Sequence, residues 1–186
     1  MSTQFTTGPT RDVQPGDTPD LNDGLLSRLI FDGLALLRGN ACVLVAGEIR
    51  LATLAFMAAG HAPFVPIESV DNTNDGLEAS GVEAPQRIAL LVEASSTALN
   101  PGDFVKPSGS GDGTVEFWIP TTDAHFEKYA KYLGKEAALL DRKAVSDFDE
   151  TLTPGIVPDQ TLTPTANDED NVGWFQLMAA GGGAAT

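Results

Sequence analysis

Short apolar runs alternate with turn-forming residues along most of the chain. The runs lie at residues 34–37, 41–46, 49–57, 64–67, 88–92, 103–106, 114–119, 137–140 and 172–178, with Gly, Pro, Asn or Asp between many of them. Runs of this length, bounded by turn residues, are typical of β-strands. The stretch 49–60 also suits a buried helical turn, because it is rich in Ala, Leu and Met. The pattern predicts a mainly β domain, either a small barrel or a sandwich.

One segment shows a helical pattern. Thr122 is a suitable N-cap, Asp123 favours the positive first turn, and Gly134 suits the position after the last turn. Between them, the apolar residues of one helical face are Phe126, Tyr129, Ala130 and Leu133. The sequence therefore predicts one short α-helix over residues 123–133.

The two ends of the chain differ from its middle. Residues 1–24 are polar and interrupted by three prolines, and residues 179–186 are mostly Gly and Ala. Neither segment holds enough apolar residues to fold alone. We therefore expect a flexible N-terminal arm over 1–24, a single β-rich domain over 25–178 and a flexible tail over 179–186. Phe5, Val13 and Leu21 are isolated apolar residues in this arm, and we predict that they bind a partner.

The balance of charge is strongly acidic. The 186 residues include 11 Lys and Arg against 26 Asp and Glu, which gives a net charge of −15 and a pI near 4.2. This charge repels nucleic acid and anionic lipid, which argues against both as partners. Lysine occurs only at positions 106, 128, 131, 135 and 143. Acidic, lysine-poor surfaces are typical of proteins that work in molar salt, where the Debye length is about 3 Å. An ordinary acidic protein is the alternative.

The sequence shows neither a membrane span nor a signal peptide, which predicts a soluble protein made in the cytoplasm. The most hydrophobic stretch, residues 41–60, contains Glu48 and Arg50, so it is not an uninterrupted membrane span. The first residues lack the apolar core of a signal peptide. Cys42 is the only cysteine and lies in an apolar run, so we expect a buried, inert side chain.

The best candidate for a metal site is the acidic stretch 71–83. Asp71, Asp75 and Gly76 match the first, fifth and sixth positions of a calcium-binding EF-hand loop, but Val82 occupies the twelfth position, which requires Glu. Helical patterns are also missing from its flanks. We interpret the stretch as a solvated acidic loop, keep Asp71 and Asp75 as weak metal candidates, and predict no cofactor.

No set of residues indicates catalysis. Ser110 lies in a Gly-rich stretch without the strand-to-helix context of a nucleophile. His61 and His125 have no second His or Cys at ligand spacing. Trp118 and Trp174 lie in apolar runs, which favours core packing or an interface. The sequence predicts that the protein is not an enzyme.

The stretch NPGDFVKPSGSGDGTVEFW, residues 100–118, predicts a tight turn at Pro101 and Gly102, then two paired strands joined by a Gly-rich connection. Together with LGKEAALLD and VGWFQLMAAGG further along, it resembles the β-barrel decoration, or cement, proteins of tailed-virus capsids. The resemblance covers about residues 88–180, and its motifs are mostly turn chemistry.

This resemblance, combined with the acidic composition, implies a structural virion protein of a virus that infects a halophilic archaeon. Such a protein decorates and stabilises the capsid shell, binds the major capsid protein and has no catalytic residues. The resemblance further implies a homo-oligomer, with a trimer favoured, on the capsid surface after assembly in the host cytoplasm. The alternative is an acidic halophilic module that binds a ligand or calcium.

Overall fold

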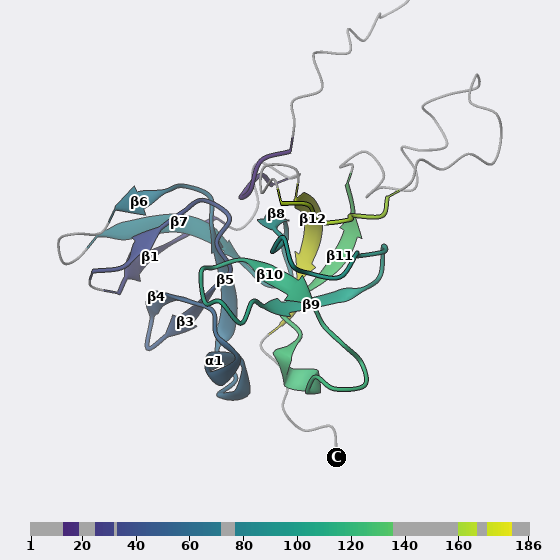
Figure 1. The fold of residues 1–186 in the computed structure, drawn as a ribbon. Coiled ribbons are helices and arrows are strands. Elements are labelled where there is room, and N and C mark those ends of the chain that lie inside the picture. The colour runs from purple at the N-terminus through teal and green to yellow at the C-terminus, as the bar shows by residue number, and fades with distance from the viewer. Residues whose placement is uncertain are drawn as a thin grey trace, which may run out of the picture.

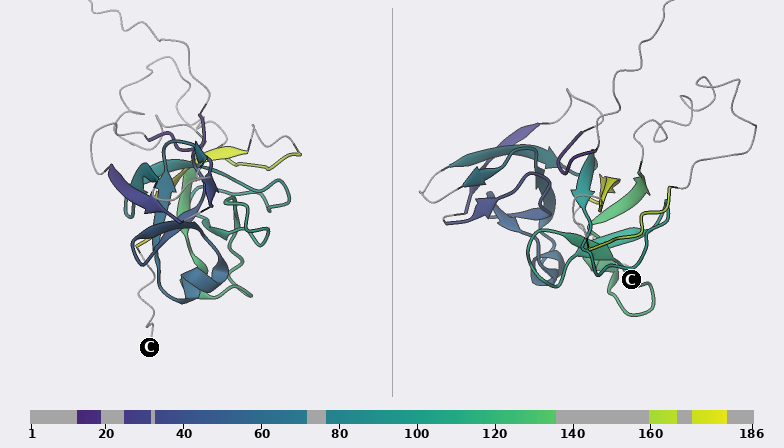
Figure 2. Two further views of the ribbon diagram at one scale, coloured as in Figure 1. Left: turned by 90° about the vertical axis from the view of Figure 1, so that its left-hand side faces the viewer. Right: turned by 45° about the horizontal axis from the view of Figure 1, so that its top comes forward.

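The computed structural model describes residues 13–18, 25–31, 33–71, 77–135, 160–166 and 171–179. Within these residues the chain is mainly β, as the sequence predicts, with one α-helix and one 3₁₀-helix. The strands form a closed five-stranded barrel, an open five-stranded sheet and a two-stranded ladder. Figures 1 and 2 show the barrel beside the open sheet. Of the two predicted architectures, the structure contains the barrel, with a second sheet packed against it.

The barrel is formed by the first half of the described chain. Its strands, in order of pairing, are β1 (Leu26–Ile30), β4 (Glu48–Leu51), β3 (Cys42–Val45), β5 (Ala62–Pro66) and β7 (Glu78–Glu83). Only β1 and β4 run parallel; the other neighbours are antiparallel, and β7 closes the barrel by pairing with β1. The buried residues of its interior are Ile30, Leu36, Cys42, Ile49, Phe64 and Ala79. A separate ladder joins β2 (Ala35–Leu36) to β6 (Val70–Asp71).

The open sheet follows in the second half of the chain. Its strands, in order of pairing, are β10 (Val115–Phe117), β9 (Phe104–Pro107), β11 (Ala130–Gly134), β12 (Val172–Leu177) and β8 (Arg87–Leu91). All four pairings are antiparallel. The hairpin predicted from residues 100–118 is confirmed, because β9 and β10 pair with Val115 opposite Pro107. The predicted strand at 137–140 lies outside the described residues.

The single α-helix lies where the sequence was ambiguous. Strand β4 ends at Leu51, and α1 spans Leu54–Ala58. Thr53 caps the helix, because its hydroxyl oxygen accepts a hydrogen bond from the Phe56 N–H at 3.3 Å. The stretch 49–57 therefore contains both a strand and a helical turn, and its one inward-facing helical residue is Met57.

The predicted helix over 123–133 is wrong. Only a 3₁₀ turn, η1 (His125–Glu127), forms there, and the chain then enters strand β11. In this strand Ala130, Tyr132 and Gly134 are buried while Lys131 and Leu133 are less so, which is the two-residue period of a strand. Strands β9 and β12 lie on either side of β11 and satisfy its backbone groups. Pairing with these distant strands therefore overrides the local helical pattern.

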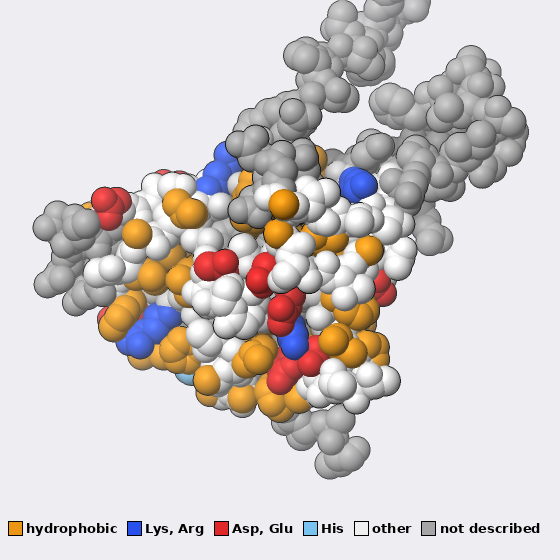
Figure 3. Space-filling model, in the orientation of Figure 1, with side chains coloured by type: hydrophobic (Ala, Val, Ile, Leu, Met, Phe, Trp, Pro, Cys, Tyr) orange, Lys and Arg blue, Asp and Glu red, His pale blue; other side chains and the backbone are white. Residues whose placement is uncertain are grey.

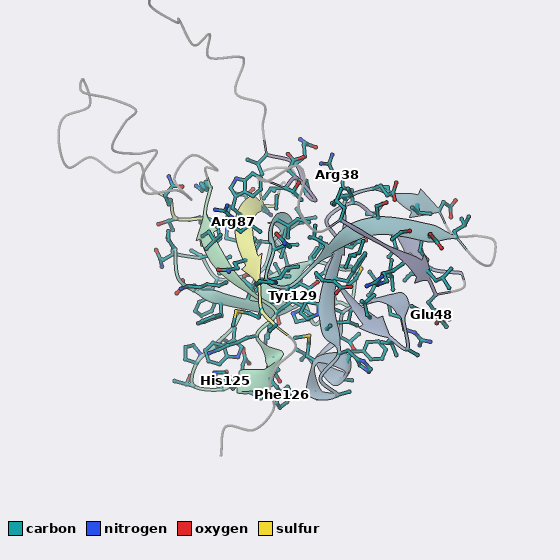
Figure 4. The ribbon with its side chains drawn as sticks, turned by 180° about the vertical axis from the view of Figure 1, so that it is seen from behind. Arg38, Glu48, Arg87, His125, Phe126 and Tyr129 are labelled. Carbon is teal, nitrogen blue, oxygen red and sulfur yellow. The ribbon has the colours of Figure 1, made fainter. Side chains whose placement is uncertain are left out.

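The barrel and the open sheet share one hydrophobic core. Its buried members include Val43, Val65, Val105 and Phe175, from β3, β5, β9 and β12 respectively. Tyr129, between η1 and β11, links the two sheets directly and is labelled at the centre of Figure 4. Its hydroxyl oxygen accepts from the Cys42 N–H at 2.9 Å and lies 2.8 Å from the Cys42 carbonyl and 2.9 Å from the Phe64 carbonyl. One buried hydroxyl thus serves two neighbouring barrel strands.

Candidate functional site

Three four-residue turns, at 14–17, 37–40 and 100–103, share one hydrogen-bonding pattern. In each, the N–H of the fourth residue donates to the carbonyl of the first, at 3.0, 3.1 and 3.0 Å respectively. The side-chain oxygen of the fourth residue, an Asp or Asn, accepts the N–H of the first residue at 2.9, 2.7 and 2.8 Å. The third residue is always a glycine with a positive φ of 77, 78 or 105°. We call these segments clasp turns.

Each clasp turn holds a strand. The N–H groups of Gly16, Gly39 and Gly102 donate to the carbonyls of Ala89, Pro66 and Tyr132, at 2.7, 2.8 and 2.9 Å respectively. At two of the strands the same residue donates back: Ala89 and Tyr132 donate to the carbonyls of Asp17 and Asp103, both at 2.8 Å. Pro66 has no N–H to donate. The sequence contains a signal for two of these clasp turns, because Pro-Gly-Asp occurs at 15–17 and again at 101–103.

The first clasp turn belongs to the segment predicted as a free arm. It packs on the second one: a Cβ atom on Gly39 would lie only 2.4 Å from the Pro15 Cβ and 2.6 Å from the Gly16 nitrogen. An ion pair between Asp17 and Arg38 joins the same two turns. Since the first turn holds β8 and the second holds β5, residues 13–18 bridge the open sheet and the barrel.

Val13 was predicted to bind a partner, and in the structure it packs on its own domain. It packs against the cluster formed by Ala89, Val172 and Trp174, directly before the first clasp turn in the sequence. Trp174 is buried there, in agreement with the expected role in core packing. The other two predicted anchors, Phe5 and Leu21, lie outside the described residues. The first clasp turn and the packing of Val13 therefore fix residues 13–18 on the domain.

A charged cluster holds the loop after β10. The Lys106 ammonium lies 2.9 Å from the Asp123 carboxylate and 3.5 Å from that of Glu116. Burial opposes the charge of Lys106, but these two carboxylates outweigh it and raise its pKa. Burial also opposes the charge of Asp123, but the Ile119 N–H and Lys106 outweigh it and lower the pKa of Asp123. Both groups stay charged at neutral pH, which suits a structural pair and not a general acid or base.

Trp118 and His125 lie in an aromatic cluster at the edge of the open sheet. The Lys128 ammonium lies 4.2 Å from the centre of the Phe104 ring and 4.1 Å from that of Trp118. The Trp118 and His125 rings meet edge to face at 6.4 Å. Figure 4 shows His125 and Phe126, which are neighbours in η1. The Lys128 ammonium of the same chain therefore covers the Phe104 and Trp118 rings.

Cys42 is fully buried in β3, as expected from its apolar run. Burial raises the pKa of its thiol well above the ordinary range, which leaves it protonated and unreactive. Burial, followed by the effect of Cys42, also raises the pKa of Tyr129, although hydrogen bonds to the backbone of Cys42 and Phe64 oppose this. Neither residue is exposed to a substrate.

The predicted acidic loop is partly a strand. Asp71 ends β6 with an exposed side chain, and residues 78–83 form β7, so the second half of the candidate EF-hand loop is extended. Asp75 lies outside the described residues. No cluster of three His, Cys, Asp or Glu side chains suited to a metal occurs among the described residues. None of the helices in that part of the chain has the length and apolar character needed to cross a membrane.

Comparison of the chain with family models, curated proteins and solved structures finds no match. The described residues form a closed β-barrel and an open sheet, which are joined by clasp turns and one shared core.

Proposed function

We propose that this chain is a structural protein of a virion, which decorates and stabilises a capsid shell in concentrated salt. The proposal rests first on the resemblance of residues 88–180 to capsid decoration proteins. In the structure, the named strands in the described parts of that region form a single sheet in the order β10-β9-β11-β12-β8. The described parts of the stretches that carry the resemblance are neighbours: VGWFQL is β12, and it pairs with the β11 strand, which contains Leu133 and Gly134. This adjacency is the observation that carries the proposal.

The surface chemistry supports the same proposal. A charge of −15 favours solubility in molar salt, where repulsion between acidic proteins is screened. The major capsid protein is then the partner, and self-association into a homo-oligomer provides several contacts with the shell at once. The protein acts by binding and needs neither a cofactor nor a catalytic centre.

The clasp turns supply a physical basis for an arm. Residues 13–18 are held on β8 by two backbone hydrogen bonds and by the packing of Val13. Residues 1–12 therefore start from a fixed position, which reduces the entropy lost when they bind a neighbouring subunit. Phe5 is the one aromatic residue of this segment and is proposed as its anchor on the shell.

The test is co-sedimentation of the purified chain with capsid shells assembled without it, in molar KCl. We expect saturable binding by the full chain and a clear loss of binding when residues 1–12 are deleted. The deletion should leave the melting temperature unchanged, because it spares the clasp turn at 14–17. Absence of binding by the full chain would exclude capsid decoration. Calorimetry with calcium supplies the rival outcome, since tight calcium binding would favour the alternative ion-binding module.

A further inference from the structure

Three strands of the open sheet carry no acidic residue on their outward face. In β8, β11 and β12 the side chains alternate, and Ile88, Tyr132 and Phe175 belong to the shared core. The residues that point the other way are Arg87, Ala89 and Leu91 of β8, Lys131 and Leu133 of β11, and Val172, Trp174 and Gln176 of β12. None of them is an Asp or Glu, although the chain contains 26 such residues. This face therefore differs in charge from the chain as a whole.

Three hydrogen-bond donors form one row across this face. Lys131 lies directly opposite Gln176, and Gln176 lies directly opposite Arg87, in the register of β11, β12 and β8. Directly opposite residues project from the same face, with their Cβ atoms about 5 Å apart. Gln176 is exposed, and Lys131 and Arg87 are half-buried. We call Lys131, Gln176 and Arg87 the basic row, and Figure 4 labels Arg87 beside β12.

Several cations elsewhere in the described residues are paired within the chain. Those that form an ion pair with a carboxylate are Arg28, Arg38, Arg50 and Lys106. Figure 3 shows few Lys and Arg side chains on the face that it draws, and one of them lies between Asp and Glu side chains. Lys131, by contrast, has no carboxylate partner within the part of the chain that the structure describes. Its ammonium is therefore available to a partner.

Residues 13–18 lie on the same side of the open sheet. Val13 packs against the cluster that contains Ala89 and Trp174, and both of these belong to the outward face. The basic row lies beside this cluster, because its β8 and β12 members are each two residues from Ala89 and Trp174 along the strands. The segment that precedes the domain and the basic row therefore share one side of the sheet.

We propose that this side of the open sheet faces the capsid shell, and that the basic row binds carboxylates of the shell protein. The assignment rests on the proposed function. A shell that assembles in the same molar salt is expected to have an acidic, lysine-poor surface as well. Two such surfaces repel each other wherever like charges meet. The basic row offers the opposite charge, on a face where no outward residue of β8, β11 or β12 is acidic.

Contacts of this kind persist in concentrated salt. Molar salt screens charges that are more than about 3 Å apart, so only groups in direct contact attract one another. The guanidinium of Arg87 can donate two parallel hydrogen bonds to one carboxylate, and the Lys131 ammonium can donate to another. Screening removes the general repulsion between two acidic proteins but leaves these short contacts in place. The basic row therefore supplies the orientation of the chain on the shell more than its affinity.

The first experiment is co-sedimentation in molar KCl with capsid shells assembled without this chain. Arg87→Gln combined with Lys131→Gln removes two positive charges and should weaken binding by about tenfold, because each exposed ion pair is worth a few-fold in affinity. Thr97→Glu combined with Thr121→Glu is the matched control. It changes the net charge by the same two units, at exposed positions outside the basic row, and should leave binding unchanged.

The outcomes separate this assignment from capsid decoration itself. Unchanged binding by the row variant, with its melting temperature preserved, would overturn the assignment of the basic row while leaving capsid decoration intact. Equal losses in the row variant and the control would show an effect of net charge and would also overturn it. Absence of binding by the unaltered chain would refute both proposals.

The second experiment uses the unaltered chain and identifies the groups in contact. A carbodiimide joins a carboxylate to an amine that touches it: an amide bond forms, and the displaced carboxylate oxygen leaves with the reagent as a urea. We expect Lys131 to become linked to an Asp or Glu of the shell protein, as read by mass spectrometry of the peptides. Lys106 is the internal control, because its carboxylate neighbours are Glu116 and Asp123 of the same chain. Shell-bound chain without a link at Lys131 would contradict the proposal.

Single-stranded nucleic acid is the rival ligand for this face. Phe104 lies opposite Lys131 on the neighbouring strand, and an aromatic ring beside cations suits a stacked base. The net charge of −15 opposes such binding, so we expect no retention of a labelled oligonucleotide at low salt. Retention by the unaltered chain, lost in the row variant, would assign the basic row to nucleic acid and overturn the proposal.

Discussion

Replacing Tyr129 by Phe tests how the barrel is joined to the open sheet. The substitution removes one oxygen atom and leaves the buried ring in place. In the native protein this oxygen accepts the Cys42 N–H at 2.9 Å and lies within 2.9 Å of the carbonyls of Cys42 and Phe64. Cys42 and Phe64 face each other on β3 and β5, so all three contacts act at one point of the barrel wall.

The expected loss in the free energy of unfolding follows from the burial of these three residues. Tyr129, Cys42 and Phe64 are fully buried, so water does not replace the lost acceptor from the surface. An unsatisfied buried N–H costs about 1–3 kcal/mol, and the bond that the hydroxyl donates adds about 1 kcal/mol. We therefore expect Tyr129→Phe to lower the free energy of unfolding by about 2–4 kcal/mol. For a chain of this size, that corresponds to a fall in melting temperature of roughly 4–16 °C.

Two measurements in molar KCl check this expectation. Urea denaturation gives the free energy of unfolding, and amide hydrogen exchange reports on the Cys42 N–H, which should exchange faster in the variant. Tyr132→Phe is the comparison, because the Tyr132 hydroxyl donates to the Gln160 carbonyl, away from β3. It should leave exchange at Cys42 unchanged. A loss below about 0.5 kcal/mol for Tyr129→Phe, with native exchange at Cys42, would show that the hydroxyl does not join the sheets.

Three further outcomes follow from the structure. Gly16→Ala should lower the melting temperature, because φ is 77° there and the added Cβ would lie 2.5 Å from the Arg38 side chain. Deletion of residues 1–18 should also lower it. An unchanged melting temperature in both variants would argue against a stabilising role of the first clasp turn. Stability to urea should fall as pH rises above 9.0, the ordinary pKa of a cysteine, because burial raises the pKa of Cys42 in the folded state alone. Cys42→Ala should reduce that slope, whereas an equal slope would remove Cys42 as the cause. Finally, the melting temperature should rise between low and molar KCl, and a flat profile would contradict adaptation to salt.

The positions of many strands could be predicted from the local sequence. Strands β3, β5, β8, β9, β10 and β12 begin and end within two residues of the predicted apolar runs. This agreement has a physical reason. A short apolar run favours a strand, and the Gly, Pro, Asn or Asp residues that bound it favour turns, so both signals are local. Strands β1 and β7 were missed. The sequence of β1, LSRLI, is apolar on both faces, and EASGVE in β7 is largely polar, so neither shows a clear alternation.

The candidate site depended more strongly on distant contacts. The sequence predicted the turn at Pro101 and Gly102, but nothing local shows that the same turn motif at 14–17 would hold β8. Val13 therefore reads as part of a free arm, although it packs against Trp174, far along the chain. The exposure of Leu29 is likewise decided by which strands lie beside β1.

What the sequence determined by itself was the β class, the positions of the turns, the buried cysteine and the acidic charge, because each depends on composition or on neighbouring residues. Only the tertiary structure decided the state of residues 130–134. The pattern AKYLG fits a helical face and a strand equally well, and local propensity does not separate the two. The strand forms because β9 and β12 offer hydrogen-bond partners on both of its edges, and those partners come from segments separated from it in the sequence.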